Sequence, residues 1–330
     1  MKPNACVSVV IPAFNAVRTI SDTLKSVFAQ TVDPHVLEII LVNDGSTDAT
    51  RTVSATLLGE SCITWQIIDV PNSGPSVARN IGFRAAKGEW IQFLDADDVI
   101  APSKLPVQLS SAPDDAAVVY SCWQRVQQRN GQWVPVGTVN RPLIEGDTTV
   151  ALLRSENFIA TGSQIFRRTW LECVGGFNER RRFIEDVELL LRISVASGGF
   201  VNVPSDLPLF FYRENEHSLS RSNRESFVDG CVENTKLAEI FWRENFAILS
   251  QAQSDVLIEA YAEAARFYYE HSRAKFQATY DRLLMLDPAY LPSRPKKLRA
   301  FSTMLGYPRA EAVALAYRKV KRRLLNNPGY

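Results

Sequence analysis

The chain of 330 residues is poor in cysteine and histidine, and the positions of these residues weigh against several kinds of site. Its five cysteines are an odd number without metal-ligand or redox spacing, which disfavours a disulfide framework and favours a reducing compartment. The sequence also lacks the Gly-x-Gly-x-x-Gly motif of dinucleotide sites and the lysine motif of phosphate-binding loops. These absences weigh against zinc sites, disulfide-stabilised domains and the common nucleotide-binding loops.

Long hydrophobic runs are missing as well. No apolar run approaches the roughly 20 residues that a helix needs to cross a bilayer. Residues 1–4 lead directly into a strand-like run, so we expect no signal peptide. Together with the cysteine pattern, this predicts a cytoplasmic protein.

The most informative feature that is present is an acidic tetrapeptide, Asp95-Ala96-Asp97-Asp98, directly after the apolar run 90–94. That run predicts a buried strand, so the acids lie at its C-terminal end, where open α/β sheets bind ligands. Carboxylates held close together repel one another unless a proton or a divalent cation lies between them. The tetrapeptide therefore suggests a Mg²⁺ or Mn²⁺ site that holds a phosphorylated substrate. The alternative is a solvated, acid-rich turn that caps the next helix.

The N-terminal half alternates between strand-like and helix-like segments. Apolar, β-branched runs predict strands at 5–11, 37–42, 65–70 and 90–94, and each run is followed by a polar loop. Amphipathic stretches follow the first three loops, and Asp48 is a plausible N-cap for the second of them. Three repeats of strand, loop and helix with short connections predict a mainly parallel sheet with helices on its faces.

The last hundred residues have a different character. Helical apolar stripes run through 254–271 and 276–286, and a final helix is predicted at 310–325. We therefore predict two domains, 1–224 and 225–330, with the second one helical. Its helices either pack on the first domain or form a partner-binding face.

The C-terminal tail is strongly basic. Residues 291–330 hold ten basic residues against one acid, a net charge of +9, and the whole chain carries +1, so the rest carries −8. A basic amphipathic helix suits the anionic inner face of a membrane. The alternatives are a solvated face or packing against the acidic remainder of the chain. Nucleic acid is disfavoured because the tail has few aromatic residues to serve as stacking platforms.

Five segments, in this order, resemble those of family 2 glycosyltransferases. They are Val-Ile-Pro-Ala-Phe-Asn at 10–15, Val-Asn-Asp-Gly-Ser-Thr-Asp at 42–48, Asn-Ser-Gly-Pro-Ser-Val-Ala-Arg-Asn-Ile-Gly at 72–82, Phe-Leu-Asp-Ala-Asp-Asp at 93–98 and Ile-Glu-Asp at 184–186. The resemblance spans residues 5–222. It implies the GT-A fold, a Rossmann-like, mixed but mainly parallel sheet with flanking helices, here followed by a C-terminal α-helical extension.

The resemblance also implies roles for individual residues. Asp44 accepts from the uracil imide, Asp97 of the DxD motif binds the metal, and Asp186, beside Glu185, is the general base. The remaining donor-binding positions are Pro12, Phe14, Asn15, Arg79, Asn80, Asp95 and Ala96. Many family members carry a histidine two residues after a Tyr-Arg pair. Here that position is Asn215, and we expect His217 to complete the metal or diphosphate site in its place.

The predicted function is that of a metal-dependent, inverting hexosyltransferase. It moves a sugar from a UDP-sugar to a hydroxyl of a glycan or lipid-linked acceptor, in polysaccharide or cell-surface glycan biosynthesis. One alternative is a catalytically silent relative that binds a nucleotide or glycan as a scaffold or regulator. A nucleotidyltransferase is disfavoured, because residues 12–15 stand where that class carries a glycine-rich loop. The sugar, the acceptor and the oligomeric state are left open.

Overall fold

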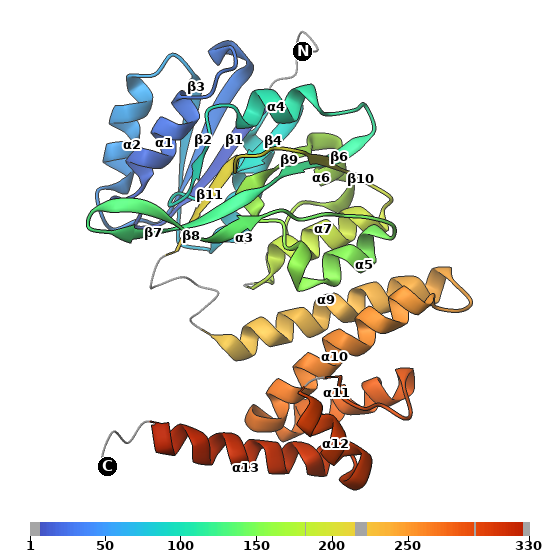
Figure 1. The fold of residues 1–330 in the computed structure, drawn as a ribbon. Helices are drawn as coiled ribbons and strands as arrows, with labels where there is room; N and C mark the ends of the chain where they lie inside the picture. Colours follow the sequence, from blue (N-terminus) through green and yellow to red (C-terminus); the bar gives the residue numbers. More distant parts are fainter. Residues whose placement is uncertain (1–6, 182, 215–222, 294, 326–330) are drawn as a thin grey trace. The chain divides into compact units, whose positions relative to one another are not determined.

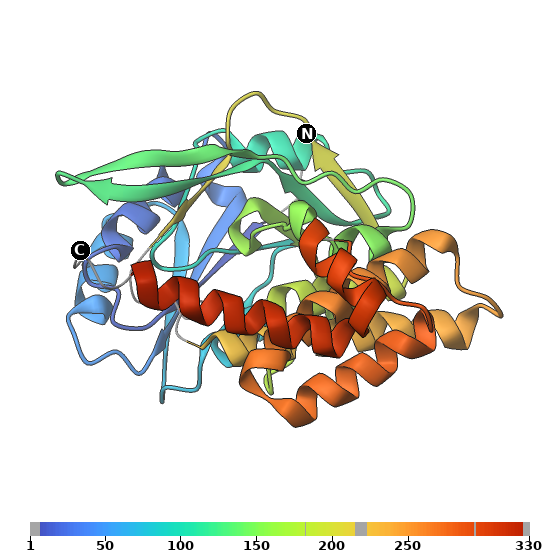
Figure 2. The ribbon, with the colours of Figure 1, turned by 60° about the horizontal axis from the view of Figure 1, so that its bottom comes forward.

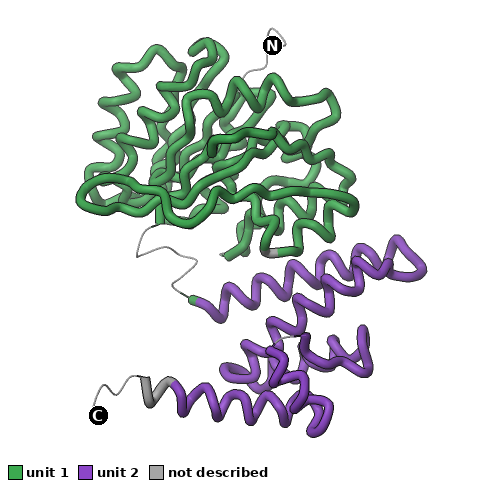
Figure 3. Tube along the Cα trace, in the orientation of Figure 1, with its two compact units in different colours: residues 1–223 green, residues 224–330 purple. Residues whose placement is uncertain are grey.

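A seven-stranded sheet forms the centre of the N-terminal part of the chain in this computed structural model (Figure 1). The structure describes residues 7–181, 183–214, 223–293 and 295–325. The chain divides into two units, residues 1–223 and residues 224–330 (Figure 3). Within the described ranges, no helix combines the length and the apolarity that crossing a membrane requires.

The strands of the large sheet lie in the order β10-β6-β9-β4-β1-β2-β3. Strands β1 to β4 pair in parallel, as do β6 and β10, whereas β9 runs antiparallel to both of its neighbours. This confirms the predicted mixed, mainly parallel sheet. The strands are β1 Val7–Ala13, β2 Leu37–Asp44, β3 Thr64–Val70, β4 Trp90–Phe93, β6 Ala116–Ser121, β9 Gln164–Arg167 and β10 Gly199–Val203.

Helices cover both faces of this sheet. Alternate residues of β1 and β2 point to opposite sides, and because most of them are apolar and buried, each face packs against helices. Val9 and Ile39 belong to a hydrophobic core with Leu24 of α1 (Ile20–Phe28) and Leu58 of α2 (Thr50–Gly59). On the other face, α3 (Pro75–Ala85) contacts both strands through Gly82. The remaining α-helices among the described residues of this unit are α4 Lys104–Ser110, α5 Thr148–Leu153, α6 Arg168–Val174 and α7 Glu185–Val195.

A second, four-stranded sheet in the order β5-β11-β7-β8 adjoins the large one. Its strands are β5 Val99–Ile100, β11 Phe210–Arg213, β7 Trp123–Arg129 and β8 Gln132–Asn140. Asn130 and Gly131 both have positive φ, as the two central residues of a type I′ hairpin turn require. The sequence predicts a strand from residue 207, but β11 begins at Phe210. The β7–β8 hairpin was not predicted.

The C-terminal unit is helical, as predicted. It consists of α9 Arg224–Asn245, α10 Gln251–His271, α11 Arg273–Leu286, α12 Lys296–Leu305 and α13 Tyr307–Leu325. A capping box of Ser250 and Gln253 starts α10 three residues before the predicted start. Buried Glu239 of α9 accepts hydrogen bonds from Tyr261 of α10 and Arg282 of α11, both at 2.7 Å, and so ties three helices together.

Candidate functional site

The candidate site lies at the carboxyl ends of β1, β2 and β4, which run parallel and end at one edge of the sheet. Asn15 joins the first two loops: its amide oxygen accepts from the Thr47 backbone N–H at 2.8 Å, and its own N–H donates to Ser46 Oγ at 3.1 Å. Asn15 has a left-handed backbone, with φ +49°. Phe14 is 51% exposed, so its ring is available to a ligand and is not a core residue.

Asp44, the last residue of β2, fixes the loop after β3. Its two carboxylate oxygens accept from the backbone N–H groups of Ser73, at 2.7 Å, and Gly74, at 2.9 Å. Gly45 follows at φ +73°, and a Cβ atom there would lie 2.7 Å from the Asn72 backbone nitrogen. Only glycine allows so close an approach with that backbone. The carboxylate of Asp44 is thus buried and held in one orientation.

The acidic tetrapeptide forms the turn between β4 of the large sheet and β5 of the small one. The Asp98 N–H donates to the Asp95 carbonyl at 3.1 Å, and Thr23 Oγ1 of α1 donates to the Ala96 carbonyl at 3.0 Å. Asp98 is buried and accepts from the Arg213 N–H at 2.8 Å. Its burial, together with the charges of Asp97 and Asp95, raises its pKa well above the usual range. Asp98 is therefore structural, whereas Asp95 and Asp97 are partly exposed.

Arg79 of α3 connects two of the predicted site segments. Its Nη2 lies 2.7 Å from Asp95 Oδ1, and its Nη1 lies 2.9 Å from Glu185 Oε1. The guanidinium is buried, 5.1 Å from the centre of the Phe177 ring. Burial disfavours its charge, but Asp95 and Glu185 more than offset this effect and raise its pKa. Arg79 is thus a permanent cation that links the turn after β4 to the start of α7, and it is not a surface residue.

Glu185 and Asp186 occupy the first turn of α7, where the helix dipole favours negative charge. Ile184 before them has φ +55°, an unusual conformation for a β-branched residue and a sign of local strain. Asp186 accepts from Thr161 Oγ1 at 3.3 Å. Burial, and then the charge of Glu185, raise the pKa of Asp186 to about 6. A carboxyl group with such a pKa can take up and release a proton near neutral pH.

Other predicted residues are placed differently. Asn80 is buried, and its side chain bonds both the N–H and the carbonyl of Phe177 at 2.8 Å, so it anchors that segment. Pro12 lies within β1, in register with Val42 of β2. Asn215 and His217 lie outside the described residues. Thr161 and Phe177 lie in segments that the sequence suggests as an acceptor-side region, but neither was predicted as a site residue, because their contacts with Asp186 and Arg79 come from tertiary packing.

The donor set at the turn after β4 fits a hard divalent cation. Asp97 and Asp95 offer carboxylate oxygens, which Mg²⁺ and Mn²⁺ prefer, and one or two carboxylates suffice where substrate phosphates complete the shell. Over the described ranges, no cluster of three or more acidic, histidine or cysteine side chains is arranged to hold a metal by itself. The residues therefore suit a cation that binds together with a phosphorylated substrate.

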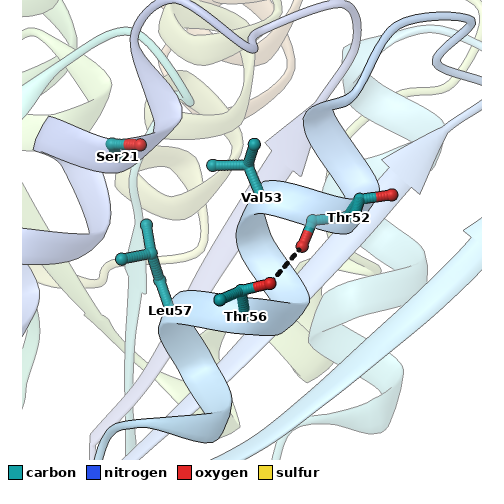
Figure 4. Close-up of a pocket in the computed structure, with 5 residues that line it drawn as sticks. All are labelled: Ser21, Thr52, Val53, Thr56 and Leu57. Atoms are coloured by element: carbon teal, nitrogen blue, oxygen red, sulfur yellow. Dashed lines mark hydrogen bonds between the residues drawn. The ribbon is translucent and has the colours of Figure 1, made fainter.

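A small surface pocket lies elsewhere, between α1 and α2 (Figure 4). Its lining side chains have no titratable group, and the Thr56 hydroxyl donates to the Thr52 carbonyl at 3.1 Å. The pocket offers no group for acid–base or metal chemistry. The lining residues are Ser21, Thr52, Val53, Thr56 and Leu57.

The sequence is similar to known glycosyltransferases. The sequence model described as glycosyl transferase family 2 matches residues 8–175. An uncharacterized glycosyltransferase of Nostoc sp. is 34% identical over 173 residues, which are 51% of this chain and 52% of that protein. Succinoglycan biosynthesis protein ExoO of Rhizobium meliloti is 28% identical over 238 residues, which are 68% and 66% of the two chains. The matches thus span about half to two thirds of these relatives.

Solved structures share the fold. Residues 1–349 of S. aureus TarS, in complex with UDP-GlcNAc, align with a TM-score of 0.67 at 18% identity, covering 95% of this chain and 92% of that one. The mannosyltransferase PcManGT of Pyrobaculum calidifontis, in complex with GDP-Man and Mn²⁺, aligns with a TM-score of 0.55 at 20% identity, covering 96% and 89%. These likenesses confirm the predicted GT-A-type fold.

Proposed function

Because the chain belongs to glycosyl transferase family 2, we propose that it transfers a hexose from a UDP-sugar to a hydroxyl group, with a divalent metal and with inversion at the anomeric carbon. The observation that carries this proposal is the pair of salt bridges that Arg79 makes. They join Asp95, on the donor side, to Glu185, which adjoins the candidate base Asp186. A binding group and a base are thereby held in one site.

The donor nucleotide is proposed to bind over the loops after β1 and β2. Asp44 accepts from the imide N–H of uracil, and the exposed ring of Phe14 stacks on the base. Support comes from the fixed carboxylate of Asp44 and from the shared fold of TarS, whose complex contains UDP-GlcNAc. Asp95 faces the ribose and the sugar. The proposed donor pocket is completed by Pro12, Asn15, Arg79 and Ala96, whereas Asn80 supports it from behind by anchoring the segment at Phe177.

The metal is proposed to bind Asp97. When bound, a divalent cation stabilises the negative charge that develops on the leaving diphosphate. The similar fold of PcManGT, whose complex contains Mn²⁺, supports this assignment. We propose His217 as the residue that completes the metal or diphosphate site, with Asn215 as the alternative.

Asp186 is proposed to take the proton from the attacking hydroxyl of the acceptor. A hydroxyl becomes a good nucleophile only as it loses its proton, and a carboxylate within hydrogen-bond reach can accept that proton. Direct attack on the face opposite the leaving group needs one base and no covalent intermediate, hence inversion. Arg79 and Glu185 act as positioning residues, because they fix the start of α7 relative to Asp95.

The acceptor is proposed to be a glycan or a lipid-linked saccharide in polysaccharide or cell-surface glycan biosynthesis. The similarity to a succinoglycan biosynthesis protein supports this class. A cytoplasmic location is supported by the free state of Cys62, Cys122, Cys173 and Cys231. A catalytically silent relative would also bind nucleotide, and turnover distinguishes the two cases.

Nucleotide titrations test the donor assignment. In the presence of Mn²⁺, we expect UDP to bind more tightly than CDP or GDP, and chelation to weaken UDP binding. In Asp44→Asn, the amide can donate to N3 of cytosine, so the preference for UDP over CDP should fall or reverse. The matched control Asp69→Asn, at the end of β3, should keep the preference for UDP. If Asp44→Asn weakened both nucleotides equally, Asp44 would have only its structural role, and the uracil assignment would be wrong.

A further inference from the structure

The C-terminal helix α13 presents an apolar stripe that its own unit does not cover. Val313, Tyr317 and Val320 follow one another at i, i+4 and i+7, which places them on one face of the helix. They are 46%, 67% and 57% exposed. From Ala316 to Lys321, every side chain except that of Arg318 is exposed. Within the described part of the C-terminal unit, this segment of α13 therefore lacks a packing partner on the stripe.

The neighbouring helix α12 also carries exposed apolar side chains. The two helices meet at the single residue Gly306 (Figure 2). Leu298 of α12 and Ala310 of α13 are buried and anchor the pair in the unit. On the exposed side of α12, Phe301, Met304 and Leu305 are 46%, 79% and 42% exposed. Exposed apolar side chains thus recur along both helices, from Phe301 to Val320, and are more than an isolated surface hydrophobic.

Positive charge surrounds these apolar residues. The one acid among residues 291–330, Glu311, is fully buried and pairs with Arg318 at 2.7 Å. Glu311 is therefore paired with Arg318 and does not offset the charge of the exposed cations. Up to residue 321, the last whose side chain the structure describes, the exposed cations of α12 and α13 are Lys296, Lys297, Arg299, Arg309, Lys319 and Lys321.

We infer that α12 and α13 form a membrane-docking surface that binds an anionic lipid bilayer. A helix with an apolar face and a basic polar face lies in the plane of the interface, where its apolar side chains enter the headgroup region and its cations meet anionic lipids. The 19 residues of α13 would extend about 28 Å along that plane. An anionic partner that has no apolar layer, such as nucleic acid, would pair with the cations but leave the apolar stripe of α13 exposed to water.

Vesicle flotation with the full-length protein tests the electrostatic part of this inference. We expect binding to vesicles of phosphatidylcholine with 30% phosphatidylglycerol, little binding to phosphatidylcholine alone, and release in high salt. Lys319→Gln/Lys321→Gln should weaken the partition coefficient on the order of 25-fold, because each cation near an anionic surface contributes about fivefold. The control Lys25→Gln/Lys87→Gln removes the same charge from exposed positions of the N-terminal unit and should bind as the wild type does.

A second pair of variants tests the apolar part. Tyr317→Ser/Val320→Ser should also lose binding, whereas Leu207→Ser, which removes a side chain that is 74% exposed in the N-terminal unit, should not. Equal binding of all variants, or no binding to anionic vesicles, would overturn the inference. So would tighter binding to duplex DNA than to vesicles. Because flotation needs no turnover, its outcome is independent of the proposed donor chemistry.

Discussion

At the scale of single residues, the site depends on charges that the fold holds against their own tendency to be solvated or neutralised. Arg79 is buried between two carboxylates, and Asp186 has lost much of its access to water. Buried charges and groups with a shifted pKa lower the stability of the fold, and they are concentrated at functional sites. The strained backbone of Ile184, next to the acid pair, is a further sign of this compromise.

Asp186→Asn tests the role of the proposed base. We expect kcat to fall by about 10²- to 10⁴-fold, the usual contribution of a general base. The free energy of unfolding at pH 7 should not fall. Because the folded state raises the pKa of Asp186 from 3.8 to about 6, ionisation costs stability as the pH rises through this range, and asparagine does not ionise.

The same shift predicts the pH dependence of the wild-type enzyme. The proposed general base acts as the carboxylate, so kcat/KM should rise as the pH increases through about 6. Asp115→Asn, at an exposed position before β6, serves as the control for both measurements. Activity that is flat from pH 5 to 8, or full activity in Asp186→Asn, would contradict the assignment.

The motif residues of the site can be predicted from the sequence, but not all of the residues that contact them. Asp95, Asp97 and Glu185-Asp186 follow from local segments that can be read directly. That Arg79 bonds both Asp95 and Glu185 could not be predicted, because 106 residues separate Arg79 from Glu185 and only the folded chain brings them together. The burial of Asn80 against Phe177 likewise depends on how α6 and α7 pack.

At the scale of elements, the strands with continuous apolar runs were the most predictable. Residues 37–42 are buried on both faces, and such runs are typical of parallel strands covered by helices. The β7–β8 hairpin was missed because polar residues dominate β7 and because Pro135 and Gly137 interrupt β8. Helix α9 was missed for a similar reason, since polar residues dominate its sequence.

The close contact of α3 with the sheet gives a prediction about packing. A Cβ atom at Gly82 would lie 2.4 Å from Val10 Cγ1 of β1. Although alanine favours helix by about 1 kcal/mol over glycine, Gly82→Ala should destabilise the fold by about 1–3 kcal/mol through overpacking. Denaturant unfolding measures this change, and Val10→Ala/Gly82→Ala should recover part of the loss.

Gly59 at the end of α2 provides the matched control. A Cβ atom there meets nothing within 4 Å, so Gly59→Ala should be neutral or slightly stabilising. If Gly82→Ala were as stable as Gly59→Ala, the contact of α3 with β1 would not be as tight as described. Because Arg79 lies one turn before Gly82, this packing also sets the position of the Arg79 guanidinium.

At the scale of the whole molecule, a family 2 glycosyltransferase fold is joined to a helical unit with a basic surface. The family could be recognised from five short segments, since each lies at a strand end or helix start where function restricts the residues. The helical unit shows no such motif, and its sequence predicted helices without their arrangement. Its exposed cations and apolar stripe point to a place of action at a membrane surface.

The most direct test of the account is release of UDP from a panel of UDP-sugars in the presence of Mn²⁺, with water or a supplied glycan as the acceptor. We expect turnover of one donor, and loss of that turnover in chelator, in Asp97→Ala and in Asp186→Asn. This result would establish the transferase and identify its sugar. If the protein bound UDP but released it from no donor with any acceptor, it would be a silent nucleotide-binding relative, and the proposed catalysis would be wrong.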